Sequence, residues 1–158
     1  MTQRRSSHLD DEGHIKMVDV GTKETTQRTA RACAHLNANP DTVEAIWSGS
    51  LPKGDALTTA KIAGIQAAKQ TPQLIPMCHH LLLDLVDITF EKTSKGIGLQ
   101  SEVRLSGKTG AEMEALTAVT IAALTLYDMA KSVQKDMVLC DAYVTHKAGG
   151  KSGSYAKE

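Results

Sequence analysis

An aspartate and a lysine near the end of the longest apolar stretch have types and spacing that suit proton transfer. Asp128 and Lys131 are three residues apart, so in a helix their side chains lie on one face. A carboxylate beside an ammonium can pass protons to and from a substrate. The same spacing is also that of an ordinary surface ion pair, worth about 0–1 kcal/mol. Spacing alone favours the ion pair, and both interpretations stay open.

Two adjacent histidines follow a cysteine in the apolar segment 73–83, QLIPMCHHLLL. Imidazole titrates near neutral pH, so His79 or His80 could carry a proton. A histidine among apolar residues is, however, more often a structural group. Neighbouring side chains rarely converge on one ion, and no carboxylate or further histidine at helical spacing completes a ligand set. We therefore expect no metal site at residues 78–80.

Two glycine-flanked lysines, in SGKTG at 106–110 and GGKSG at 149–153, resemble parts of a phosphate-binding loop. The full pattern needs a glycine five residues before the glycine that precedes the lysine. Glu102 and Thr145 occupy those positions, so we reject a P-loop. Seven cations lie in or beside loops and element ends: Lys23, Arg28, Lys53, Lys69, Lys131, Lys147 and Lys151. They are ordinary solvated charges unless the fold gathers them, in which case they suit a polyphosphate and lower the pKa of a neighbouring lysine.

The elements that must position these groups are led by one long helix, predicted at residues 111–134. This segment contains no proline or glycine and opens on Glu112 and Glu114, where the helix dipole favours negative charge. No charged residue occurs between 115 and 126, so the helix should be buried on every side. One side then packs on a sheet and another on a second subunit, which predicts a stable oligomer.

Alternating apolar and polar residues predict strands at 14–20, 85–91, 97–105 and 137–146, and also at 23–35, where a helix is the alternative. Segments 85–91 and 97–105 form a hairpin, and helices are predicted at 42–48 and 56–69. The result is an α+β fold, with an antiparallel sheet, helices packed on one face and extra N-terminal strands. We expect a flexible tail at 1–13, a single catalytic domain at 14–148 and a mobile Gly/Lys/Ser-rich tail at 149–158.

Composition narrows the possible classes of function. The formal net charge is zero, and the few aromatic residues are scattered, so no base-stacking surface for nucleic acid is indicated. The apolar run is interrupted by threonines and is too short for a bilayer, which needs about 20 apolar residues. Three cysteines without CxxC spacing, and no apolar segment after Arg4 and Arg5, predict a reduced, cytoplasmic protein.

Four long segments carry a family resemblance: MVDVGTKETTQR, KGDALTTAKIAGIQAAKQTPQLIPMCHHL, LSGKTGAEMEALTAVTIAALTLYDMAKSVQKDM and HKAGGKSG. They closely resemble the molybdenum cofactor biosynthesis protein C family, the cyclic pyranopterin monophosphate synthases. The resemblance implies a ferredoxin-like subunit in a homohexamer, built as a trimer of dimers with its active site at a subunit interface. It implies conversion of 3′,8-cyclo-7,8-dihydroguanosine triphosphate to cyclic pyranopterin monophosphate with release of pyrophosphate. Such a phosphorus–oxygen lyase would use general acid/base catalysis and no redox cofactor, and whether Mg²⁺ accompanies the triphosphate stays open.

The resemblance also implies roles for individual residues. The catalytic groups would be Asp128, Lys131, Lys53, His79 and Glu112. The substrate would be bound by Met77, Cys78, His79, Met113, Glu114 and Lys147, with Arg28, Lys69 and Lys151 as phosphate ligands. We expect Asp128 to hold Lys131, and Lys53 and Lys147 to crowd its ammonium so that it gives or takes a proton.

Two questions remain after the resemblance. The family usually has proline where this chain has His80, which leaves open the loop conformation and which imidazole faces the ligand; we choose His79. The rival function is a non-catalytic module that binds a nucleotide for regulation. Such a module would need the cations but no acid/base pair beside them.

Overall fold

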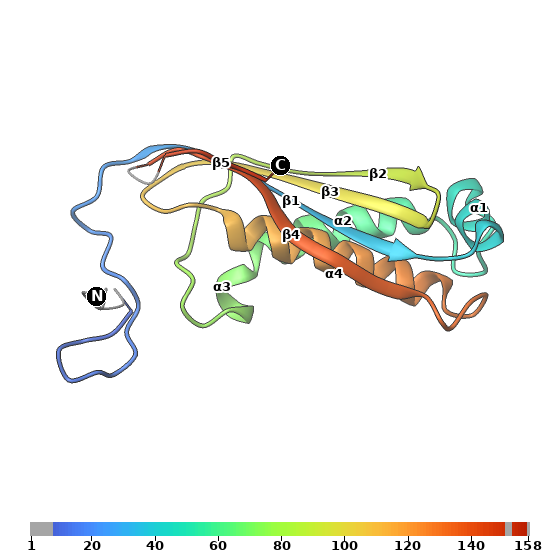
Figure 1. The fold of residues 1–158 in the computed structure, drawn as a ribbon, viewed down its shortest axis with the longest axis horizontal. Coiled ribbons are helices and arrows are strands. Elements are labelled where there is room, and N and C mark those ends of the chain that lie inside the picture. The colour runs from blue at the N-terminus through green and yellow to red at the C-terminus, as the bar shows by residue number, and fades with distance from the viewer. Residues whose placement is uncertain (1–7, 151–152, 158) are drawn as a thin grey trace.

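Nine elements make up the part of the chain that the computed structural model describes, residues 8–150 and 153–157. In chain order they are β1 (Thr26–Asn37), α1 (Pro40–Ser48), α2 (Ala56–Lys69), α3 (Thr71–Leu74), β2 (Leu85–Thr93), β3 (Gly96–Gly107), α4 (Glu112–Ala130), β4 (Val138–Ala148) and β5 (Tyr155–Ala156). The strands form one sheet in the order β2-β3-β1-β4-β5, and every neighbouring pair is antiparallel. Helices α2 and α4 cover one face of this sheet (Figure 1).

The alternation of residues in β1 explains this layering. Ala30, Ala32, Ala34 and Leu36 are buried, whereas the residues between them are not. Because successive side chains of a strand point to opposite faces, the buried set faces the helices. The predicted α+β class, the antiparallel sheet with helices on one face and the β2–β3 hairpin are therefore confirmed. Segment 23–35 is mostly strand, as predicted, and not the alternative helix.

Helix α4 is the centre of the core, but one of its faces is open in the single chain. Its buried residues include Ala118, Val119 and Leu126, and Ser101 of β3 donates a hydrogen bond to the carbonyl of Ala115 at 2.7 Å. By length and composition α4 could cross a membrane, yet half of its most apolar window is buried in this fold, as in a core helix. Leu124 is 53% exposed. The sheet side of α4 is buried as expected, and the covering of its open face by a second subunit stays a prediction.

Helix α4 also ends at Ala130, four residues before the predicted end. Beyond it the chain turns, and two tertiary contacts hold the turn. The backbone N–H of Asn39 donates to Gln134 Oε1 at 2.9 Å, and the Tyr127 hydroxyl donates to the carbonyl of Lys135 at 2.8 Å. Helix propensity contains no information about such contacts, so the helix predicted from the sequence was longer than α4.

A glycine allows α2 and α4 to approach closely. A Cβ atom at Gly64 would overlap Cδ1 of Ile88 and lie 2.6 Å from the carbonyl oxygen of Ala118. Any side chain there would push α2 away from both α4 and β2. The small residues of segment 56–69 therefore allow α2 to pack closely against its neighbours.

Two terminal segments differ from the prediction. Residues 14–20 form no strand: Ile15 makes an isolated bridge with Leu9, and residues 8–25 form an arm that leaves the sheet (Figure 1). The alternating residues of 14–20 pair with no strand of the sheet, and Ile15 is 77% exposed. At the other end β4 continues to Ala148, and β5 pairs with it where only a mobile tail was expected. From residue 8 onwards, the described chain therefore has no strand before β1.

Candidate active site

A cavity of about 390 Å³ lies where three segments meet: the start of α4, the loop after α3 and the N-terminal arm. This cavity collects six of the predicted site residues, Met77, Cys78, His79, Glu112, Met113 and Glu114. We call these six residues the cavity cluster. They come from two segments more than 30 positions apart in the sequence, and the fold brings these two segments together around one cavity.

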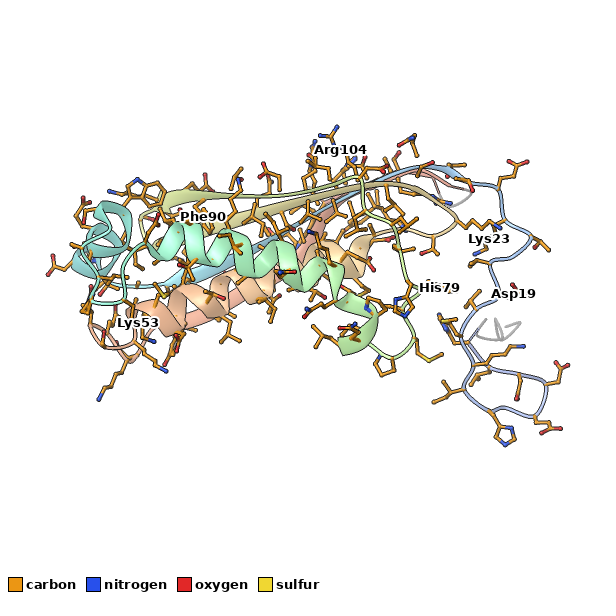
Figure 2. The ribbon with its side chains drawn as sticks, turned by 180° about the vertical axis from the view of Figure 1, so that it is seen from behind. Asp19, Lys23, Lys53, His79, Phe90 and Arg104 are labelled. Atoms are coloured by element: carbon orange, nitrogen blue, oxygen red, sulfur yellow. The ribbon has the colours of Figure 1, made fainter. Side chains whose placement is uncertain are left out.

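His79 is oriented by the arm. Its Nε2 lies 2.8 Å from the carbonyl oxygen of Val18, and because a carbonyl only accepts, Nε2 carries the hydrogen. Nδ1 is then the basic nitrogen of the neutral ring. His79 lines the cavity and is half-buried, whereas His80 is exposed and lies outside it. Figure 2 shows His79 on the side of the molecule where the arm carries Asp19 and Lys23. Of the two histidines only His79 lines this cavity, and its choice as the imidazole that faces the ligand stays a prediction.

The two carboxylates of the cavity cluster have different surroundings. Glu112 Oε1 accepts an ion-pair contact from Lys147 Nζ at 3.1 Å. Glu114 is only 3% exposed. Burial, with a smaller contribution from the charge of Glu112, raises the pKa of Glu114 to about 7. Burial, followed by the nearby charge of Glu114, also raises the pKa of the Cys78 thiol.

A second cavity, of about 600 Å³, adjoins the first and is rich in cations. It shares Lys23, Thr109 and Gly110 with the first cavity and adds Arg28 and Lys108. Arg28 covers the turn at Gly149 and Gly150, where a Cβ atom at Gly150 would overlap its guanidinium group. Lys108 Nζ donates to the carbonyl of Gly21 at 2.6 Å, which holds the arm against the cavity wall.

These cations only partly match the predicted phosphate ligands. Arg28 was predicted. Lys23 and Lys108 were not assigned to the site, although both were visible as loop cations and Lys108 lies in the fragment SGKTG. Lys69 is exposed at the end of α2 and lines neither cavity. Lys151 lies outside the described residues.

The remaining predicted catalytic residues form a separate group, which we call the helix-end cluster: Lys53, Asp128 and Lys131. Lys53 Nζ donates to Asp128 Oδ2 at 2.7 Å and to its carbonyl at 3.0 Å, while Lys131 Nζ pairs with Oδ1 at 2.7 Å. Lys53 reaches Asp128 from the turn before α2, where the side chain of Asp55 accepts a hydrogen bond from the backbone N–H of Thr58. Each carboxylate oxygen of Asp128 therefore has its own cation.

The charges of the helix-end cluster correct one prediction. Hydrogen bonds, from Lys131 first and then from Lys53, lower the pKa of Asp128 to about 2. The same bond to Asp128 raises the pKa of Lys131, which was expected to be lowered by crowding. The crowding argument fails because Asp128 binds both Lys53 and Lys131 and its bond to Lys131 dominates, while Lys147 pairs with Glu112 at the other end of α4. Within one chain Lys131 is an ammonium ion able to donate a proton, not a free base.

The two clusters are far apart in one chain. Glu112 and Asp128 lie on the same helix, and at about 1.5 Å per residue they are about 24 Å apart along its axis. Figure 2 places Lys53 and His79 at opposite ends of the layer formed by α2 and α4. No small substrate can touch both clusters of one chain. Among residues 8–150 and 153–157, no group of three or more His, Cys, Asp or Glu side chains could hold a metal ion.

This fold and site define an α+β protein whose acid–base cavity opens beside a cationic cavity suited to an anionic small molecule. The chain belongs to the MoaC family, whose model matches residues 17–150. Its antiparallel sheet with helices on one face is consistent with the ferredoxin-like fold expected from the resemblance.

Curated relatives match almost the whole chain. It is 51% identical over 151 residues to the cyclic pyranopterin monophosphate synthase of Oleidesulfovibrio alaskensis, covering 94% of this chain and 95% of that protein. The protein of that name from Nitratidesulfovibrio vulgaris is 51% identical over 154 residues, covering 96% of both chains. The one from Pelotomaculum thermopropionicum is 46% identical over 154 residues, covering 96% of this chain and 91% of its own.

Proposed function

We propose that this chain is a cyclic pyranopterin monophosphate synthase of molybdenum cofactor biosynthesis. It would convert 3′,8-cyclo-7,8-dihydroguanosine triphosphate to cyclic pyranopterin monophosphate and release pyrophosphate. The names of relatives aligned over nearly their full length support this function. The observation that carries it is the pair of adjoining cavities, one with acid–base groups and one with cations.

The proposed reaction needs both kinds of cavity. Rebuilding a purine and ribose into a pterin requires several proton transfers, for which His79 and the two glutamates of the cavity cluster are suited. Holding a triphosphate and neutralising the departing pyrophosphate requires cations, which Lys23, Arg28 and Lys108 supply. The step is a rearrangement with elimination, catalysed by a phosphorus–oxygen lyase that needs no redox cofactor. Mg²⁺ could accompany the triphosphate as part of the substrate.

We further propose that a second subunit completes each active site. The helix-end cluster belongs to the same predicted catalytic set as the cavity cluster but is about 24 Å away along α4. Leu124, one helical turn before Asp128, is an exposed apolar residue. Contact between subunits along this face would cover Leu124 and bring the helix-end cluster of one chain to the cavity of another. The assembly would be a cytoplasmic homohexamer, a trimer of such dimers.

A direct assay tests the proposed function. The purified chain is incubated with the cyclised dihydro-GTP derivative, and pyrophosphate and pterin are measured over time. Multiple turnover is expected, and Lys131→Ala should lose most of it. The rival function, regulatory nucleotide binding, predicts that the compound binds without release of pyrophosphate. Binding with no turnover by a folded, oligomeric preparation would replace the enzyme proposal with that rival.

A further inference from the structure

Glu114 is a buried carboxyl group that faces the cavity. It lies in the first turn of α4 and lines the 390 Å³ cavity, yet only 3% of the residue is exposed. A buried carboxyl group without a counter-ion is more stable in its protonated form, because burial removes the water that would stabilise the charge. The state of this proton depends on which charged groups surround it.

The neighbours of Glu114 provide no direct counter-ion. The titratable groups that line this cavity come from the arm, from the loop after α3 and from α4 itself: His8, Lys23, Cys78, His79 and Glu112. Lys147 of β4 contacts Glu112. Lys147 is taken up by Glu112, and within the described ranges no cation lies within 4 Å of the Glu114 carboxyl group. Glu112 adds a like charge on the same turn, which also favours the neutral form of Glu114.

Two adjacent carboxyl groups therefore differ in their roles. Glu112 is ion-paired and suited to accept hydrogen bonds. Glu114 is buried, has no ion-pair partner among the described residues and is suited to donate a proton. The pKa of Glu114, raised to about 7 by burial, lets the group hold its proton at rest and still release it at neutral pH. Separate environments for two acids in one site are a common way of assigning acid and base roles.

We propose that Glu114 is a general acid of the active site, giving its proton to a basic nitrogen or oxygen atom of the substrate. The proposal rests on the proposed function and deepens the role of one residue in it. The carboxyl O–H bond breaks as the bond from that proton to the substrate atom forms, and its electron pair stays on Glu114 as carboxylate. A proton taken up from water through the open cavity restores the acid before the next turnover.

The test compares Glu114→Gln with the parent chain. Glutamine keeps the shape and can donate a hydrogen bond, but it cannot release a proton. We expect kcat to fall by about 10²-fold or more, a typical loss of acid–base help, with KM within a few-fold of the parent. The fall of parental kcat/KM as pH rises above about 7 should disappear in the variant. Glu91→Gln, at an exposed glutamate of β2, is the matched control and should keep both activity and pH profile.

A second measurement needs no substrate. Carbon-13 NMR of glutamate-labelled protein should show one carboxyl group that titrates near pH 7 in the parent and in Glu91→Gln but not in Glu114→Gln. Glu114→Asp keeps an acid at this position and serves as the second variant in case Glu114→Gln folds poorly. It should retain more turnover than Glu114→Gln. A parent enzyme that turns over while Glu114→Gln stays within a few-fold overturns the role of Glu114 alone. A parent that releases no pyrophosphate overturns the proposed function, and a missing carboxyl titration overturns the neutral acid in either case.

Discussion

Two variants that are inactive separately should restore turnover when their subunits are mixed. His79→Ala removes the imidazole of the cavity cluster, and Lys131→Ala removes a cation of the helix-end cluster. Because about 24 Å of α4 separates the clusters in one chain, we expect each active site to combine the cavity of one subunit with the helix end of another. A mixed dimer then contains one site with both defects and one site with neither.

The expected recovery follows from counting sites. Random pairing of equal amounts makes about half of the dimers mixed, and half of the sites in a mixed dimer are intact, so about a quarter of parental turnover should return. The two variants carry different affinity tags, are dissociated and reassembled together, and are assayed for pyrophosphate release. Reassembled parent protein defines full activity.

A matched control uses two defects in the same cluster. His79→Ala mixed with Glu112→Gln should give no recovery, because every cavity in that mixture is damaged. The reasoning is refuted if mixed oligomers, verified by recovering both tags, are as inactive as the separate variants. Equal recovery in the same-cluster mixture would also refute it, since recovery would then not depend on sharing between subunits.

Three further predictions concern α4. Asp128→Asn should lower turnover by about 10²-fold without changing the oligomer mass in light scattering; turnover within a few-fold of the parent would make its contacts with Lys53 and Lys131 structural only. Leu124→Asp should change the unfolding free energy of an isolated chain by only about 0.5 kcal/mol, so a loss of oligomer mass would show that a partner covers Leu124, and a monomeric parent would contradict the assembly. Glu114 binds its proton more tightly in the folded than in the unfolded chain. Between pH 4.5 and about 7, rising pH should therefore destabilise the parent relative to Glu114→Gln by about 1.4 kcal/mol per pH unit. The unfolding free energies are measured by denaturant titration at each pH, and the same pH dependence in both proteins would contradict the buried acid.

The fold was predictable wherever burial of one face makes apolar residues recur at regular spacing in the sequence. Ala30, Ala32 and Ala34 alternate because one side of β1 faces helices, and the hairpin of β2 and β3 is equally local. Segment 14–20 alternates in the same way but lies in the arm and pairs with no strand of the sheet. Pairing partners are a property of the whole fold, and a local pattern does not contain them.

The motifs predicted residues of the cavity cluster and of the helix-end cluster for one site, without separating the two clusters. Glu112 and Asp128 were expected in one helix, and the rise per residue already separates them by about 24 Å. The position of Lys147 is set by the sheet, because β4 runs back antiparallel to β1, with Ala30 opposite Lys147 and Asn37 opposite Val138. That return carries Lys147 away from Lys131 and towards the start of α4.

The length of α4 has a consequence for which changes the chain can accept. One residue inserted between Ala115 and Leu126 would add about 1.5 Å and rotate everything after it by about 100° about the helix axis. Asp128 would then turn away from its present direction relative to the start of α4, and Lys53 could no longer reach it from the turn before α2. Amino-acid replacements at exposed positions of α4 keep this register, whereas insertions and deletions destroy it. The helix therefore acts as a spacer of fixed length and phase, and a library of single-residue insertions should be depleted of active members along its whole middle.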